Sequence, residues 1–142
     1  MSDISTQSGY VEYVDNENPE VVKNTAATSP QQFTVPIASV MLWRMEVRIP
    51  PGHAGLTGIA LFDGTVPVIP WASSGTPWII GDDDLLEYPY NKELGASVSL
   101  YAYNTSTLYT HGWQVRLIYS YMSQIGTNDE AVIVISPSIT GT

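Results

Sequence analysis

Two histidines, His53 and His111, are the side chains of this sequence best suited to move protons near neutral pH. Nucleophilic catalysis needs such a base beside a nucleophile, with a third group that orients the base. Serines are plentiful, but the G-x-S-x-G elbow of serine hydrolases is missing from the sequence. His53 follows a tight Pro-Pro-Gly turn, and His111 falls in phase with Trp113 and Val115. We therefore predict a protein that is not an enzyme, in which both histidines have structural roles.

Three adjacent carboxylates, Asp82, Asp83 and Asp84, form the strongest local charge feature. Ca²⁺ prefers hard oxygen ligands, so this run is a candidate calcium site. Its spacing is not that of an EF-hand loop, however, and a solvated acidic loop that protects a sheet edge from aggregation is the simpler interpretation. Zinc needs at least three suitable ligands, which two distant histidines and no cysteine do not supply. We expect neither a metal nor an organic cofactor.

Tyrosine and tryptophan dominate the aromatic residues, with nine Tyr and four Trp against two Phe. An aromatic body with a polar tip suits wet protein interfaces and stacking on sugars, and it also fills cores and their rims. All three roles stay open from the sequence. The candidate interface residues are Tyr10, Tyr13, Trp71, Trp78, Tyr88 and Tyr90.

Composition and charge exclude several classes of partner. The net charge is −9 with five basic residues, too few and too scattered for a phosphate-binding stripe or an anionic membrane surface. No apolar run is long enough for a transmembrane helix, and the first ten residues do not resemble a signal peptide, so we expect synthesis in a cytoplasm. Only 13% of the residues are charged, which suits a protein packed against neighbours, and we expect a homo-oligomer.

The hydrophobic periodicity along the middle of the chain is two, which is typical of β-strands. The odd positions from Met41 to Ile49 are apolar, while Arg44, Glu46 and Arg48 between them are charged. Residues 96–104 and 107–122 alternate in the same way, and Pro89 confines the segment around it to a sheet edge. This pattern predicts an all-β fold, a β-sandwich or jelly roll of about eight short antiparallel strands.

Extended arms are expected at both ends of this sandwich. Residues 1–31 are polar and interrupted by prolines, so we predict an N-terminal arm there. The β-sandwich domain is predicted over residues 32–122, and a C-terminal arm over 123–142. This second arm contains the short apolar strand Ala131–Ser136, which either closes the sheet or adds to the sheet of a partner.

Four segments occur in a suggestive order: IPPGHAGLTGIAL, VIPW, WIIGDDD and AYNTSTLYTHGWQVRLIY. This order resembles a pattern in small virion proteins of tailed bacteriophages, where PPGHxGLTG precedes a P-W/W segment and a final YN…H…V strand. The likeness covers roughly residues 44–120 and carries over no catalytic residue. The positions that it singles out are Pro50, Pro51, Gly52, His53, Gly55, Gly58, Asn104 and His111.

The resemblance implies a β-sandwich or jelly-roll component of the virion, assembled in the host cytoplasm. A head decoration (cement) protein is the first expectation, and a head–tail connector or tail-associated subunit is the second. The implied partners are the major capsid protein or neighbouring virion subunits, and among homo-oligomers a trimer is favoured. The competing hypothesis is a binding module in which Trp71, Trp78 and the acidic run 82–84 bind a glycan or calcium.

The same positions have a physical interpretation without the resemblance. Pro50 and Pro51 stop the preceding strand from continuing its ladder, and Gly52 permits a positive φ after them. Gly55 and Gly58 let the chain bend or approach another backbone closely. We therefore predict that this Gly-rich, His-bearing stretch is a structural corner between two strands rather than an active site.

Overall fold

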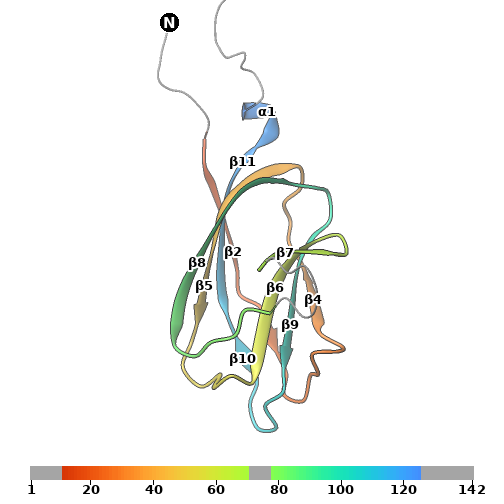
Figure 1. Cartoon of the computed structure of the whole chain (residues 1–142), viewed down its shortest axis with the longest axis vertical. Helices are drawn as coiled ribbons and strands as arrows, with labels where there is room; N and C mark the ends of the chain where they lie inside the picture. The colour runs from red at the N-terminus through yellow and green to blue at the C-terminus, as the bar shows by residue number, and fades with distance from the viewer. Residues whose placement is uncertain (1–10, 71–77, 126–142) are drawn as a thin grey trace, which may run out of the picture.

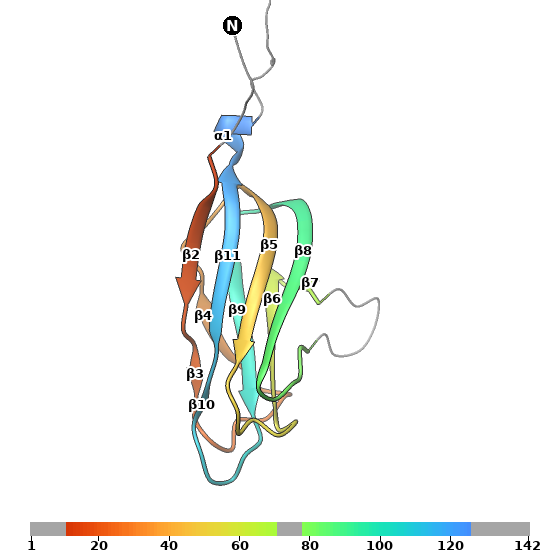
Figure 2. The ribbon, with the colours of Figure 1, turned by 90° about the vertical axis from the view of Figure 1, so that its left-hand side faces the viewer.

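The computed structural model describes residues 11–70 and 78–125, and these form two antiparallel four-stranded sheets packed face to face (Figures 1 and 2). The predicted all-β sandwich is confirmed. We name the two layers the β5 sheet and the β6 sheet. The β5 sheet has the order β2 (Tyr13–Glu17), β11 (Gln114–Tyr121), β5 (Val40–Ile49) and β8 (Asp84–Leu94). The β6 sheet has the order β4 (Gln31–Thr34), β9 (Val98–Asn104), β6 (Thr57–Asp63) and β7 (Val66–Ile69).

The order of pairing identifies the sandwich as a jelly roll. Along the chain, the first of these eight strands pairs with the last, β2 with β11, and the second with the seventh, β4 with β9. The third and sixth, β5 and β8, and the fourth and fifth, β6 and β7, complete the nested set. Such nested antiparallel pairing across two sheets is the jelly-roll winding. Two short strands, β3 (Glu20–Val21) and β10 (His111–Gly112), pair separately beside it.

A β-bulge changes which residues of β5 face the core. The sequence predicted one apolar face running from Met41 through Trp43 to Ile49, but Ile118 and Tyr119 of β11 pair with Arg44 and Leu42, so β5 has one extra residue at this point. An extra residue in a strand reverses the alternation beyond it. Leu42 is therefore fully buried, whereas Trp43 lies on the outer face, where its Nε1 donates a hydrogen bond to Ser120 Oγ at 2.9 Å.

The core lies between the two sheets and consists of aliphatic side chains from both. Each fully buried Leu or Ile contributes about 1.5–3 kcal/mol relative to an exposed position. Trp113 and Tyr119 extend this cluster on the β11 side. The largest side chains that are fully buried in it are Leu42, Met45, Ile49, Ile59, Leu61, Leu94, Leu100 and Leu117.

The predicted N-terminal arm over residues 1–31 is wrong for much of its length. β2 pairs with β11 along five residues, and β3 places Val21 fully buried in the core. The strand β2 was not predicted because it is a half-buried edge strand that mixes polar and apolar residues, so its hydrophobic alternation is weak. Backbone pairing with β11, rather than a hydrophobic face of its own, holds this strand in the sheet.

At the other end, β11 is followed directly by the short helix α1 (Met122–Ile125), close to the predicted end of the sandwich domain at residue 122. Ala131–Ser136 and most of the predicted C-terminal arm lie outside the described residues. No helix in the described part of the chain has the length and apolar character needed to cross a membrane.

Candidate functional site

The two histidines meet at one end of the sandwich, where β5 passes over to β6. Their ring centroids lie 4.6 Å apart, and the edge of Trp113 packs on His53 at 5.0 Å. His53 is 1% exposed, with Nδ1 at 2.6 Å from Thr57 Oγ1 and Nε2 at 3.0 Å from the carbonyl oxygen of Gly112. One side chain thus joins the PPG turn, the start of β6 and the segment before β11.

These contacts assign the tautomer of His53. A carbonyl oxygen only accepts hydrogen bonds, so Nε2 carries the proton and donates to Gly112. In the neutral ring Nδ1 then accepts from the hydroxyl of Thr57. Burial lowers the pKa of His53 from 6.5, which favours this neutral form. Both nitrogens are engaged, so His53 has no free nitrogen for a substrate or a metal.

Asp82 closes the corner from the opposite side. Its Oδ1 accepts hydrogen bonds from the backbone amides of Gly52 at 2.8 Å and Ala54 at 3.0 Å. These amides, the Ala54 amide above all, lower the pKa of Asp82, because hydrogen bonds to a carboxylate favour its charged form. The first aspartate of the acidic run therefore holds the turn that contains His53.

The other two aspartates of the run also have partners within the protein. Asp83 forms an ion pair with Arg48 at 2.9 Å, and Asp84 Oδ2 accepts a hydrogen bond from the amide of Asp82 at 3.0 Å. A calcium site requires several carboxylate oxygens converging on one point. Among the residues that the structure describes, no group of three acidic, histidine or cysteine side chains is arranged to hold a metal ion.

The glycines of the corner meet two different needs. Gly52 and Gly55 have φ values of +108° and +75°, a region that side-chain-bearing residues rarely adopt. Gly58 instead makes a close approach, because a Cβ there would collide with the ring of Tyr103 and lie 3.0 Å from Cβ of Trp78. Pro50 and Pro51 follow the last residue of β5, as the structural corner predicted from the sequence would require.

Asn104, at the end of β9, fixes the neighbouring loop. Its Nδ2 donates to the carbonyl oxygens of Val21 at 3.0 Å and Tyr109 at 2.8 Å, and its Oδ1 accepts from the amide of Ser106 at 3.0 Å. The side chain is fully buried, and these three bonds use both donors and an acceptor. Asn104 thus ties together β3, the end of β9 and the segment that leads to His111.

The four described residues of the predicted aromatic interface, Tyr13, Trp78, Tyr88 and Tyr90, lie in separate places. Tyr13 on β2 stacks on Tyr119 and meets Tyr121 edge-on, while Trp78 packs edge-on against Tyr103 at 5.0 Å. Tyr88 and Tyr90 lie together on β8, at the other edge of the β5 sheet. Tyr10 and Trp71 lie outside the described residues, so the suggested glycan platform of Trp71 and Trp78 is not described as a unit.

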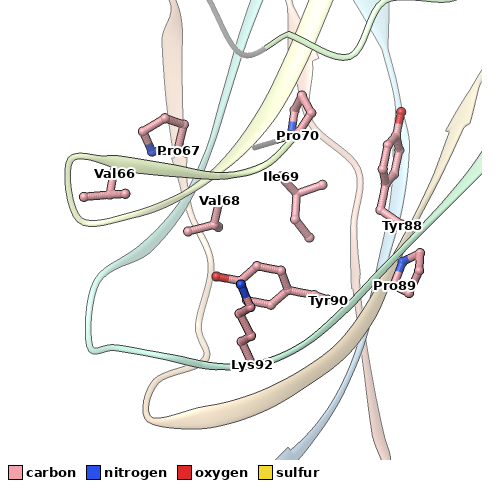
Figure 3. A pocket seen from close by; sticks show the side chains of 9 residues that line it. All are labelled: Val66, Pro67, Val68, Ile69, Pro70, Tyr88, Pro89, Tyr90 and Lys92. Carbon is pink, nitrogen blue, oxygen red and sulfur yellow. The ribbon is translucent and has the colours of Figure 1, made fainter. Parts of the chain in front are cut away.

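Tyr88 and Tyr90 line a groove at one side of the sandwich, where the edge strands β7 and β8 face one another (Figure 3). We call it the β7–β8 groove. β7 and β8 belong to different sheets and are not paired with one another, so no ladder between them closes this side of the sandwich. The volume of the groove is about 510 Å³. Its lining residues are Val66, Pro67, Val68, Ile69, Pro70, Tyr88, Pro89, Tyr90 and Lys92.

Sequence reasoning missed this groove, although one signal for it was available. Pro67 and Pro70 bracket a very short apolar run, and Pro89 marks another edge strand. Two edge strands that each contain a proline, one in each sheet, indicate a side of the sandwich that no strand pairing closes. Their meeting across the interior depended on the nested winding, which the sequence did not specify.

No family model and no curated protein matches this sequence. Among solved structures, a chain of the "Cyanophage Pam1 capsid asymmetric unit" is similar, with 10% identity and a TM-score of 0.46 over 85% of this chain and 92% of that chain. A chain described under "Bacillus endospore appendages form a novel family of disulfide-linked pili" has 10% identity and a TM-score of 0.39, over 84% of this chain and 98% of that one. At these TM-scores neither likeness assigns a function.

Proposed function

We propose that the protein is a structural component of a tailed bacteriophage virion, most specifically a head decoration (cement) protein bound to the capsid shell. The observation that carries the proposal is the role of the PPGHAGLTG segment. Its polar groups and glycines build the corner between β5 and β6, as expected for a pattern shared by structural proteins. The sequence resemblance of residues 44–120 to small virion proteins supplies the class.

The chemistry of the corner supports a binding role rather than catalysis. Nδ1 of His53 is hydrogen-bonded to the hydroxyl of Thr57, but His53 and Thr57 are each only 1% exposed, so this pair is closed to a substrate. A hydrolase would need its nucleophile and base to be accessible to the substrate. We therefore propose that the protein acts through its surfaces, without a catalytic residue and without a cofactor.

The surface chemistry supports contacts with other subunits. Only 13% of the residues are charged, so much of the surface is available for uncharged polar and aromatic contacts with neighbours. The β7–β8 groove presents apolar and tyrosine side chains beside exposed strand edges, which are ready templates for pairing with another chain. The proposed partners are the major capsid protein and further copies of this chain.

Labelling of virus particles tests the proposal directly. Antibodies raised against the purified protein are applied to particles of the virus that carries this coding sequence, and the label is located by electron microscopy. We expect label over the head shell, and peptides of this chain in the mass spectrum of washed particles. Particles that contain no such peptides and bind no label would contradict a virion role.

The same experiment separates the decoration role from its alternative. Label confined to the neck or to the tail would replace the decoration assignment with a head–tail connector or a tail-associated subunit. Particles formed without the protein provide the control, because a decoration protein added back from solution should bind their heads.

A further inference from the structure

We propose that the β7–β8 groove receives the segment Ala131–Ser136 of a second copy of this chain, paired as an added strand along the free edge of β8. This inference deepens the proposed function and rests on it for the need of contacts between copies. It identifies which part of one subunit binds which part of the next.

Within the described part of the chain, the groove leaves some of the interior of the sandwich uncovered. Tyr88 and Tyr90 face inward from β8 and pack against the core, yet they stay only half-buried, and they line the groove together with residues of β7. β8 and β7 are edge strands of their sheets, and Leu85 on β8 is 73% exposed. The free edge of β8 beside an apolar groove is an acceptor for β-strand addition, in which backbone bonds give affinity and pockets give specificity; Pro89 within that edge has no N–H to donate, so its neighbours would supply the donors.

The sequence of the proposed donor fits this acceptor. AVIVIS alternates Val132 and Val134 on one face with Ala131, Ile133 and Ile135 on the other. A segment this apolar is stabilised by pairing that removes at least one of its faces from water. In the groove, one face would meet the inward side chains of β8, and the other would lie beside the exposed outer surface of the same strand.

An antiparallel register also matches the charges. With Val132 opposite Tyr90 and Val134 opposite Tyr88, Glu130 falls opposite Lys92. Directly opposed residues share a face of the sheet, so both valines would enter the groove beside the two tyrosine rings (Figure 3). Lys92 lies 5.8 Å from the centroid of the Tyr90 ring and forms no ion pair with another described residue. Glu130 would supply that missing partner.

The position of α1 favours a second copy over the chain's own groove. α1 lies beyond the end of β11, on the side of the sheet away from β8 (Figure 2). Residues 126–130 separate it from the donor segment and span about 3.3–3.6 Å each when extended. A path back to the same molecule would cross three strand spacings of about 4.8 Å each and then descend along β8, which consumes essentially the whole reach. The donor segment can reach the groove of a neighbouring copy without crossing back over its own sheet.

Two full-length variants test the proposal by complementation. Val132→Asp with Val134→Asp removes the donor, and Val68→Asp blocks the acceptor groove. We expect native mass spectrometry to find oligomers of the unmodified protein, monomers of each variant alone, and a 1:1 heterodimer when the two variants are mixed. A mixture that stays monomeric, or a variant that still oligomerises alone, would overturn the proposal.

Matched controls carry the same charges elsewhere. Ser138→Asp with Thr140→Asp lies beyond the donor segment, and Val22→Asp lies on an exposed residue away from the groove. Both controls should oligomerise like the unmodified protein. Loss of oligomers in either would show that charge alone prevents assembly and would overturn the assignment of the two surfaces.

Hydrogen exchange on the unmodified protein provides a second measurement that does not depend on the folding of Val68→Asp. We expect amide protection in Asp84–Leu94 and Ala131–Ser136 to rise together with protein concentration. Protection that is present in the monomer and independent of concentration would identify the chain's own segment as the occupant and overturn exchange between copies. Particle labelling is independent of this result, so the virion role and the strand exchange can fail separately.

Discussion

At the scale of single residues, the corner depends on His53 more than on any other polar side chain. Its two hydrogen bonds join Thr57 and Gly112, which are far apart in the sequence, and its ring packs against His111 and Trp113. Buried polar groups that lose their partners cost the full desolvation of the group left behind. The stability of the corner should therefore be sensitive to this position.

The first prediction concerns the removal of this side chain. His53→Ala leaves the Thr57 hydroxyl and the Gly112 carbonyl without their partner and opens a cavity beside Trp113, so we expect a loss of about 2–4 kcal/mol in the free energy of unfolding. Urea titration measures it. His111→Ala is the matched control, because His111 is only half-buried, and it should cost clearly less. Equal losses for the two variants would contradict the role given to His53.

The second prediction follows from the direction of the pKa shift. Burial lowers the pKa of His53, so below about pH 6.5 the unfolded chain binds a proton that the folded chain does not. The stabilising effect of His53 is thus complete above this pH and is lost progressively as the pH falls towards the lowered folded pKa. Glu17 acts in the opposite direction, because burial and Asp15 raise its pKa to about 7 and its protonated form favours folding.

The contribution of Glu17 cancels when two proteins that share it are compared. We therefore expect the stability difference between the unmodified protein and His53→Ala to shrink as the pH is lowered from about 7.5 to about 5. Urea titrations at several pH values measure this difference. A constant difference across the range would mean that His53 is not held neutral.

At the scale of the elements, the residue type at the start of β6 is restricted by the space beside Gly58 rather than by its backbone φ. Gly58 has no room for a Cβ because of the Tyr103 ring, so Gly58→Ala should destabilise the protein by about 1–3 kcal/mol. A double-mutant cycle with Tyr103→Ala checks the cause. In the Tyr103→Ala background, Gly58→Ala should lower the free energy of unfolding by less than it does in the unmodified protein. If the losses of the two single variants simply add, the clash lies elsewhere.

β2 provides the fourth prediction, since it replaces part of the expected arm. Removal of residues 1–10 leaves β2, β3 and their pairing intact, so we expect little change in the thermal midpoint. Removal of residues 1–21 takes away the β2–β11 ladder and the fully buried Val21, and it should lower that midpoint markedly. Calorimetry compares the two. A similar midpoint for both truncations would show that β2 contributes nothing to stability.

The sequence predicted those elements whose periodicity is strong. β9 and β11 alternate clearly, and the PPG corner was recognised from the backbone preferences of proline and glycine. The bulge in β5 was not predictable, because a register shift leaves no mark in composition. β2 was not predicted, because an edge strand with one solvent-exposed side does not need a hydrophobic face. The 4.6 Å between the ring centroids of His53 and His111 depends on which strands end side by side, and the periodicity of the sequence does not specify this.

At the scale of the whole molecule, the nested winding gives the two sheets a single core. Each sheet contains strands from both halves of the chain, and their inward side chains form one buried cluster. Neither sheet has a core of its own, so neither should persist without the other.

The fifth prediction is therefore a single cooperative unfolding transition. Tryptophan fluorescence and far-ultraviolet circular dichroism should give coincident curves in urea, because Trp113 lies in the same core that the strands enclose. Leu100→Ala should shift both curves by the same amount. Two separated transitions would mean that one part of the jelly roll, such as β2 with β3, unfolds independently.

The pairing of the first and last strands has a mechanical consequence. β2 begins and β11 ends at the same end of the β5 sheet, with Tyr13 opposite Tyr119 as the outermost pair. Tension applied between the two chain ends would therefore open this ladder one rung at a time, as a zipper opens, instead of shearing all its bonds at once. A subunit tethered through both of its ends would yield first at the seam between β2 and β11, while the rest of the jelly roll stayed closed.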